Sequence, residues 1–256
     1  MGAPRIDLNA DLGESFGAWT MGSDEELLGL VTSANVACGF HAGDPAVMDR
    51  TVARAVAGGV AVGAHPGHLD LRGFGRRTIA ALPAEVEADV VYQVGALAAF
   101  AASHGVRLVH VKPHGALYNQ AAADEGLARA IARAVARVDR GLVLVGLAGS
   151  APMRRAAGAE GLRFAAEAFA DRAYEPDGSL RPRTKAGAVI ADPDEAAAQA
   201  VGIARDGTVR AQDGTEVGVR AETLCLHGDH PHALAIARAV RRALEGAGLE
   251  VRALER

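Results

Sequence analysis

Short apolar runs alternate with helical patterns along most of this chain, and this alternation restricts the fold more than any other feature of the sequence. Seven runs are predicted to be strands, and they cover residues 6–9, 33–38, 60–64, 106–111, 142–147, 163–167 and 222–226. Nearly every strand is continuously apolar, which is typical of strands buried on both faces. Strands that alternate with helices predict parallel pairing through helical crossovers. A short closing strand is predicted over residues 249–254.

The helices are predicted from their start signals and their apolar spacing. Pro83 begins a long pattern in which Val86, Val90, Val94 and Leu97 share one face. A second helix is predicted over residues 124–138. Five further starts are predicted: a Ser23/Glu26 capping box, the pairs Asp44-Pro45 and Asp192-Pro193, Ser150 as an N-cap, and Pro231 before the last helix.

Two segments interrupt the alternation. Residues 171–191 are too long for a simple connection, and long loops in compact domains are often lids or binding loops. Residues 206–221 predict a β-hairpin that turns at Asp213-Gly214. Because no linker composition separates two parts, residues 1–256 are predicted to form a single domain.

Polar residues gather where the predicted strands end. An open sheet concentrates its site at one switch point, whereas a barrel brings every strand end to one rim. Ionisable groups follow six of the seven strands, which favours an α/β fold of the TIM-like (β/α) barrel type with seven strand-helix units. The candidate site residues in chain order are Asp7, Asn9, Asp11, Glu14, Asn35, His41, His65, Lys112, His114, Glu167, Arg172, His227 and Asp229.

These candidates differ in how well a purely structural role explains them. Asp11 and Glu14 are as compatible with turn or cap positions as with chemistry. Asp7 and Asn9 lie inside a strand, where a carboxylate is costly without a partner or ligand. Lys112 ends an apolar strand, so its ammonium must pair, reach solvent or bind an anion.

Metal and nucleotide motifs are weak in the sequence. His41, His65 and His227 are candidate metal ligands, but no compact ligand spacing of the H-E-x-x-H kind occurs. The phosphate-binding pattern GxxxxGK[ST] is absent. Cys38 and Cys225 are predicted to be small buried residues.

Charge and composition exclude several classes of partner. The net charge is −4 without a basic cluster, which argues against nucleic acid. No apolar run approaches the roughly 18 residues that would predict a membrane span. Two cysteines fit a reducing compartment, so a soluble cytoplasmic protein is expected.

Seven blocks of sequence cover nearly the whole chain, and they are IDLNADLGESFGAW, TSANVACGFHAGDP, GAHPGHLDLRGFGRR, YQVGAL, HVKPHGALYN, EAFADRAY and LCLHGDHP. Together, and in this order, they resemble the LamB/YcsF family. The resemblance implies a barrel related to polysaccharide deacetylases. It also implies ATP-dependent opening of 5-oxoproline to L-glutamate, with ADP and phosphate as products. Two partner subunits, B and C, are implied, and they resemble parts of a carboxylase-like allophanate hydrolase.

The candidate residues suit that chemistry as hypotheses. Asp11 or Glu14 is expected to act as base, His114 as acid, and Lys112 as an electrostatic clamp. The other candidates would orient 5-oxoproline, ATP or a metal such as the Mg²⁺ that accompanies ATP. Two alternatives stay open: a metal-dependent deacetylase-like hydrolase, and a non-catalytic substrate-binding subunit. The subunit that holds ATP and the oligomeric state also stay open, and a homo-oligomer is compatible with the sequence.

Overall fold

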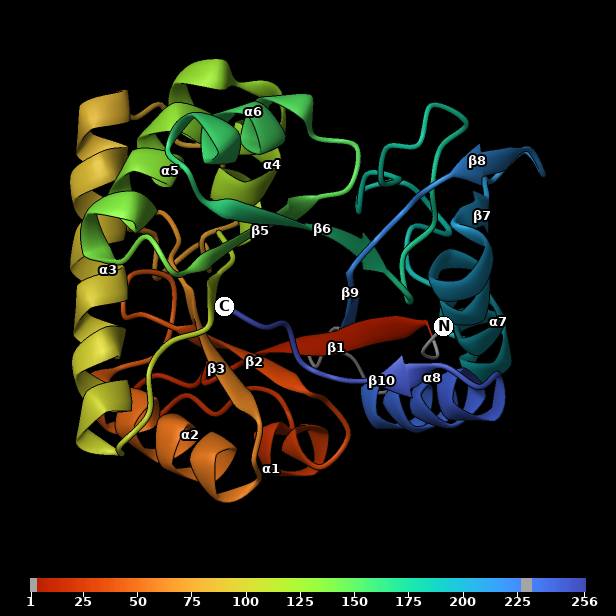
Figure 1. Cartoon of the computed structure of the whole chain (residues 1–256), viewed down its shortest axis with the longest axis horizontal. Helices are drawn as coiled ribbons and strands as arrows, with labels where there is room; N and C mark the ends of the chain where they lie inside the picture. The colour runs from red at the N-terminus through yellow and green to blue at the C-terminus, as the bar shows by residue number, and fades with distance from the viewer. Residues whose placement is uncertain (1–3, 227–231) are drawn as a thin grey trace.

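A computed structural model describes residues 4–226 and 232–256, and within them seven parallel strands form a closed barrel (Figure 1). The strands are β1 (Arg5–Leu12), β2 (Ser33–Ala37), β3 (Ala61–His65), β4 (His110–Val111), β5 (Val143–Leu147), β6 (Arg163–Phe169) and β9 (Thr223–Leu226). They pair in that order, and β1 pairs with β9 to close the ring. The predicted barrel and its seven strands are confirmed.

Helices surround the barrel and supply the crossovers between its strands (Figure 1). They are α1 (Asp24–Leu28), α2 (Pro45–Ala57), α3 (Pro83–Ser103), α4 (Gly115–Ala123), α5 (Glu125–Val138), α6 (Ala151–Ala159), α7 (Pro193–Val201) and α8 (Ala233–Gly246). A π-helical turn, Gly202–Asp206, continues α7. None of the described helices combines the length and the apolar character needed to cross a membrane.

Most of the predicted helix starts are confirmed by their caps. The side chains of Asp44, Asp192 and Ser150 each accept backbone N–H groups at the start of a helix. The Ser23 capping box is wrong, because the Ser23 side chain makes no capping hydrogen bond. Instead, the Asp24 carboxylate accepts the N–H of Gly13, a contact that ties α1 to the end of β1. Pro231 lies outside the described residues.

Two strand predictions were too long, and one helix was missed. Only the last two residues of 106–111 form β4, because Val106 and Leu108 pack into the core without pairing in the ladder. The closing strand shrinks to β10 (Glu250–Val251), which pairs with the start of β1 outside the ring. Residues 115–123 form the unpredicted α4, whose first residue, Gly115, has a φ of +53°.

The two segments that interrupt the alternation, residues 171–191 and 206–221, lie between β6 and β9. The predicted hairpin is confirmed as β7 (Thr208–Arg210) and β8 (Glu216–Gly218), and Gly214 at its turn has a φ of +88°. Residues 171–191 carry two isolated bridges, one of which joins Tyr174 to Leu180. This segment reaches the carboxyl ends of the strands and contributes to the cavity described below.

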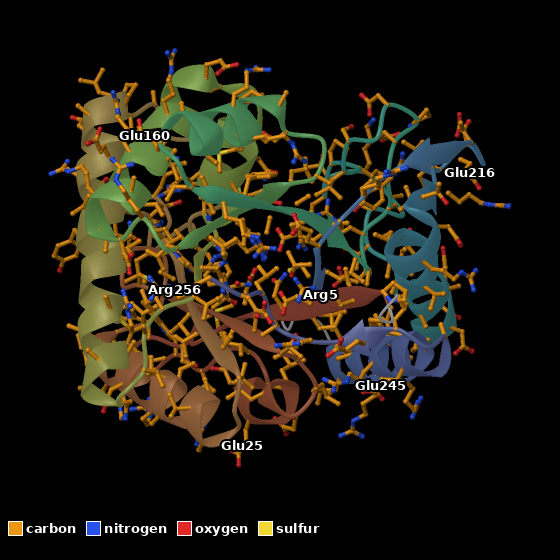
Figure 2. The ribbon with its side chains drawn as sticks, viewed as in Figure 1. Arg5, Glu25, Glu160, Glu216, Glu245 and Arg256 are labelled. Carbon is orange, nitrogen blue, oxygen red and sulfur yellow. The ribbon has the colours of Figure 1, made fainter. Side chains whose placement is uncertain are left out.

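Strand β1 separates an apolar layer from a polar one. Ile6, Leu8, Ala10 and Leu12 belong to the main hydrophobic cluster. The alternate residues Asp7, Asn9 and Asp11 point the other way, because successive side chains of a strand alternate between its faces. Figure 2 shows the resulting concentration of nitrogen and oxygen atoms in the middle of the barrel. Both faces of β1 are therefore covered, one by apolar side chains and the other by polar groups.

Candidate functional site

The lowest polar layer of the barrel is centred on Asp7. Its Oδ1 accepts hydrogen bonds from Thr32 Oγ1 at 2.6 Å and Ser33 Oγ at 2.7 Å, and its Oδ2 accepts one from Thr223 Oγ1 at 2.5 Å. Burial raises the pKa of this carboxyl, although the three hydroxyl donors oppose that shift. Asp7 does not line the cavity that opens at the carboxyl ends of the strands. Its hydrogen bonds connect β1 with β2 and β9.

The next layer links Asn9 to side chains on three other strands. Asn9 Nδ2 donates to Glu167 Oε1 at 3.0 Å, and Asn9 Oδ1 accepts from Asn35 Nδ2 at 2.7 Å. Asn35 Oδ1 in turn lies 2.7 Å from His110 Nε2. Burial, followed by the charge of Lys112, lowers the pKa of His110 to about 3, so this ring is neutral near pH 7. The layer is a continuous network that fixes the orientation of each member.

Lys112 is the charge at the centre of the site, and it is only 3% exposed. Its Nζ lies 3.0 Å from Asp11 Oδ1, 2.9 Å from Glu167 Oε1 and 3.0 Å from Cys225 Sγ. Burial alone would lower the pKa of Lys112, but Asp11 and the other anionic groups raise it well above its usual range. Lys112 is therefore a permanent cation held between two carboxylates.

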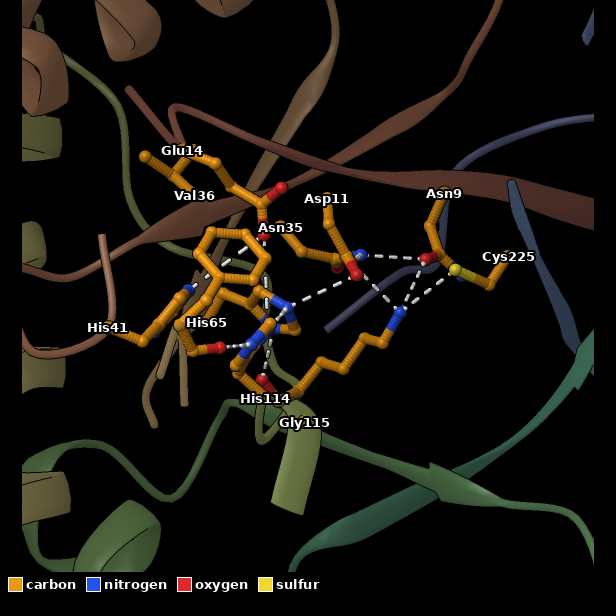
Figure 3. Close-up of polar contacts among 12 residues, drawn as sticks. Asn9, Asp11, Glu14, Asn35, Val36, His41, His65, His114, Gly115 and Cys225 are labelled. Atoms are coloured by element: carbon orange, nitrogen blue, oxygen red, sulfur yellow. Dashed lines mark hydrogen bonds and ion pairs between the residues drawn. The ribbon is translucent and has the colours of Figure 1, made fainter. Parts of the chain in front are cut away.

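Three imidazole rings, those of His41, His65 and His114, gather with the carboxylate of Glu14 close to Asp11 (Figure 3). The rings of His41 and His114 stack with 3.8 Å between centroids, and His65 Nε2 lies 3.0 Å from His114 Nδ1. Glu14 Oε1 lies 3.9 Å from both His41 Nε2 and His114 Nδ1. Among the described residues, this is the cluster whose ligand atoms could hold a metal, since all four atoms lie within 4.8 Å of one another.

Burial keeps two histidines of this cluster, His41 and His114, neutral. Burial and the neighbouring His65 lower the pKa of His114 to about 3, and burial and His114 lower that of His41 well below its usual value. Two glycines allow the rings to pack so closely. A Cβ on Gly75, whose φ is +61°, would lie 2.7 Å from His114, and one on Gly67 would lie 2.8 Å from His41.

A cavity of about 470 Å³ opens over these groups at the carboxyl ends of the strands. Asp11, His65, Lys112 and His114 form part of its wall, and Tyr118 and Phe169 form an aromatic part. Its remaining charged lining consists of arginines, which are Arg76, Arg172, Arg181 and Arg183. A mouth with this excess of cations suits an anionic ligand.

Most of the predicted site residues converge in the barrel. Asp11, His65, Lys112 and His114 reach the cavity, whereas Asn9, Asn35 and Glu167 lie beneath it in the hydrogen-bond network. Glu14 and His41 complete the histidine cluster. Arg172 lines the cavity, but its guanidinium donates to the carbonyls of Ala188 and Arg181 and so also braces segment 171–191. Two of the metal candidates, His41 and His65, lie together; His227 and Asp229 fall outside the described residues.

Several residues of the site were missed or treated as structural in the sequence. Cys225 was predicted to be buried, and it is, but its Sγ also accepts a hydrogen bond from Lys112. Burial raises the pKa of both cysteines, that of Cys38 to about 12, which fits inert thiols. Tyr118 follows the predicted strand end and could have been assigned from its place four residues after His114. Arg76 carried no signal, because the 66–82 loop reaches the mouth only through the tertiary fold.

Comparisons with known proteins agree with this architecture. The model of the LamB/YcsF family matches residues 6–256. The chain is 60% identical over 250 residues to the 5-oxoprolinase A subunit of Bordetella pertussis, covering 98% of this chain and 99% of the relative. The crystal structure of a lactam utilization protein from Thermus thermophilus superposes with a TM-score of 0.93 at 55% identity, covering 98% of this chain and 100% of that one.

A more distant structure shares the barrel fold. A T48 deacetylase with substrate superposes with a TM-score of 0.50 at 15% identity, covering 97% of this chain and 87% of that one, which shows a shared fold and no more. The resemblance of the seven sequence blocks is confirmed by the family match and by the relatives that span nearly the full chain. The chain belongs to the LamB/YcsF family.

Proposed function

We propose that this chain takes part in the ATP-dependent hydrolytic opening of 5-oxoproline to L-glutamate, with ADP and phosphate as the other products. Relatives that match it over nearly their whole length are named as the A subunit of 5-oxoprolinase. The observation that carries the proposal is the cavity at the mouth of the barrel, where cations surround a buried group of carboxylates and imidazoles. 5-Oxoproline has one carboxylate and one lactam amide, so it needs a cationic clamp and groups that move protons.

The lactam amide is a poor electrophile, and ATP would make it reactive. In this scheme the γ-phosphoryl group moves from ATP to the lactam oxygen, and a first water adds to the ring carbon. The carbon–nitrogen bond then breaks as the nitrogen takes up a proton. A second water releases phosphate from the new γ-carboxyl group. Two waters and one ATP are consumed for each glutamate.

The residues of the mouth divide these tasks according to their geometry. Asp11, with its side chain 14% exposed and next to the permanent charge of Lys112, is placed to activate water as a general base, with Glu14 as the other candidate. Lys112 and the mouth arginines stabilise negative charge on a carboxylate or phosphoryl group. His114 suits the acid role less well than the sequence suggested. It is neutral, its Nε2 faces the carbonyl oxygen of Phe74, and its Nδ1 is therefore placed to accept a proton.

The name of the relatives implies further subunits, and we propose that the partners are subunits B and C, of the carboxylase and allophanate-hydrolase type. ATP, with Mg²⁺ as its counter-ion, is the proposed co-substrate. The test is glutamate and ADP production from 5-oxoproline and ATP, with this chain alone, with B and C alone, and with all three. We expect turnover only in the complete mixture. No glutamate from the three folded proteins together would overturn the proposal.

Single variants in the complete mixture distinguish a catalytic subunit from one that only binds. Asp11→Asn should lower kcat and leave KM for 5-oxoproline within a few-fold, whereas loss of a purely binding role raises KM at unchanged kcat. Arg129→Ala on the exposed face of α5 is the control.

A metal-dependent hydrolase of the deacetylase type is the second candidate, and the cluster of Glu14 with three histidines favours it. It predicts hydrolysis without ATP and full loss of activity on chelation.

A further inference from the structure

The rings of His65 and His114 meet nitrogen to nitrogen, and the other nitrogen of each ring faces a backbone carbonyl. His65 Nδ1 lies 2.7 Å from the carbonyl oxygen of Lys112, and His114 Nε2 lies 2.9 Å from that of Phe74. A carbonyl oxygen only accepts hydrogen bonds, so both of these nitrogens must carry the hydrogen. The backbone thus fixes the tautomer of each ring.

This assignment leaves two lone pairs aimed at each other. If both rings are neutral, each has one N–H, and His65 Nε2 and His114 Nδ1 are both unprotonated while they lie 3.0 Å apart; His65 Nε2 also lies 3.3 Å from Asp11 Oδ2. Two acceptors at that distance repel unless a positive charge lies between them. Either a proton or a metal ion satisfies this requirement, and the neighbouring side chains distinguish the two.

His41 is the residue that a shared proton leaves unexplained. It is 1% exposed, and neither of its ring nitrogens has a hydrogen-bond partner among residues 4–226 and 232–256. A buried polar group without a partner destabilises the folded protein. A proton between His65 and His114 would do nothing for His41, whereas a metal ion at the centre of the cluster would bind all three rings.

The spacing of the cluster is close to that of a first-row ion site. Two ligands that each lie about 2.1 Å from a tetrahedral metal are about 3.4 Å apart. His65 Nε2 and His114 Nδ1 lie 3.0 Å apart, Glu14 Oε1 lies 3.9 Å from the nitrogens of His41 and His114, and all four ligand atoms lie within 4.8 Å of one another. Binding of one ion therefore requires the side chains to move closer and the His41 ring to turn out of its stack on His114. The carbonyls of Lys112 and Phe74 supply the outer hydrogen bonds that typically orient histidine ligands.

We propose that Glu14, His41, His65 and His114 bind one divalent transition-metal ion, separate from the Mg²⁺ that accompanies ATP. Three imidazole nitrogens and one carboxylate oxygen suit zinc or a neighbouring first-row ion better than magnesium or calcium, which prefer oxygen ligands. Such an ion next to Asp11 and Lys112 would polarise a carbonyl or bind a phosphoryl oxygen. His114, as a ligand, is then unavailable as the general acid.

The test measures metal directly, without substrate or partner subunits. The purified chain is stripped with a chelator, dialysed against zinc, cobalt(II) or manganese(II), and its metal content is measured by inductively coupled plasma mass spectrometry. We expect about one ion per chain for at least one of the three metals. Glu14→Gln and His41→Ala should each weaken its affinity at least tenfold, because even loss of an outer-shell partner costs about 10- to 100-fold. His104→Ala is the control, since that ring pairs with Asp49 on the helical surface.

Two further measurements separate loss of a metal ligand from loss of folding. Circular dichroism shows whether each variant is folded, and Glu14→Gln removes a charge without changing the shape of the side chain. The visible spectrum of the cobalt form reports its coordination, and we expect Glu14→Gln to alter that spectrum while His104→Ala leaves it unchanged. Folded wild-type protein that takes up none of the three ions, or equal affinity in wild type, Glu14→Gln and His41→Ala, would overturn the proposal. Metal binding by this chain, together with no glutamate production by the mixture of all three subunits, would refute the proposed function and leave the metal site standing.

Discussion

Replacing Lys112 with methionine tests whether the centre of the barrel depends on one buried cation. Lys112 Nζ lies within 3.0 Å of Asp11 Oδ1 and Glu167 Oε1, and its own exposure is 3%. Methionine has a similar length and keeps most of the packing, so the substitution removes mainly the charge. We expect it to destabilise the protein strongly.

The magnitude follows from what the two carboxylates lose. At an effective dielectric constant near 20, one ion pair at 3 Å is worth about 5 kcal/mol before desolvation is subtracted. Breaking a buried pair by removing one partner typically costs about 3–5 kcal/mol. Asp11 is 14% exposed at its side chain and can be hydrated, but Glu167 is fully buried. Most of the cost should therefore come from the charge of Glu167.

A second substitution isolates that charge. Glu167→Gln keeps an oxygen to accept the hydrogen bond from Asn9 and removes the negative charge. The free energy of unfolding is measured by urea denaturation at pH 7 for the wild type, the two single variants and the double variant. We expect the double variant to recover about 2 kcal/mol or more relative to Lys112→Met, since contacting residues in one network couple by up to about 3 kcal/mol.

Two results would contradict this reasoning. A cost below about 1 kcal/mol for Lys112→Met would show that water reaches Glu167 and screens it. A double variant as unstable as Lys112→Met would show that lost packing, and not an unpaired charge, causes the damage. Arg129→Ala provides the baseline for removing an exposed cation.

Three further outcomes are expected. The pKa of His110 is about 3, and that of a histidine in the unfolded chain is about 6.5, so the unfolded chain binds more protons below pH 6.5 and the protein becomes less stable as pH decreases. Between pH 7.5 and 5.5 this histidine should lower the free energy of unfolding by about 1.4 kcal/mol. Urea denaturation at both pH values should show that this part of the pH dependence is absent in His110→Gln. Gly63→Ala puts a Cβ 2.1 Å from His110 Nε2 and should cost about 3 kcal/mol in thermal unfolding, whereas Gly95→Ala, in open space on α3, should be neutral or stabilising. Arg183→Ala, whose side chain lines the cavity without a hydrogen bond or ion pair among the described residues, should raise KM for an anionic substrate about 10- to 100-fold and leave stability unchanged.

The barrel was predictable because its signal is repeated. Each strand-helix unit carries its own apolar run and its own caps, and caps such as Asp44 and Asp192 act locally. Errors arose where one feature had two physical causes. Val106 and Leu108 are apolar because they pack in the core, and the sequence alone does not separate packing from pairing in a sheet. Helix α4 was missed because it begins at Gly115, a weak helix former, directly after the strand end and without a side-chain cap.

The candidate site was predictable as a set of residues and not as a set of roles. Chain order places Asp11, Lys112 and His114 at strand ends, and parallel strands bring those ends together. The direction of each side chain depends on contacts across the barrel that no local pattern records. Asp7 and Asp11 lie four residues apart on one strand face, yet Asp7 is held by three hydroxyl groups below the site, and Asp11 reaches the cavity.

Because β1 and β9 close the ring, the site is complete only when these two strands have paired. The hydrogen bond from Thr223 to Asp7 spans 216 positions of the chain, and Lys112 meets Cys225 only across the same closed ring. Contacts of such long range form slowly, because a large loop must be ordered before they compensate for its entropy. A chain that ends before β9 carries Asp11, Glu14, Lys112 and His114 but lacks the strand that closes the ring. The hydrogen-bond network beneath the cavity is therefore complete only once residues 223–226 have joined the ring.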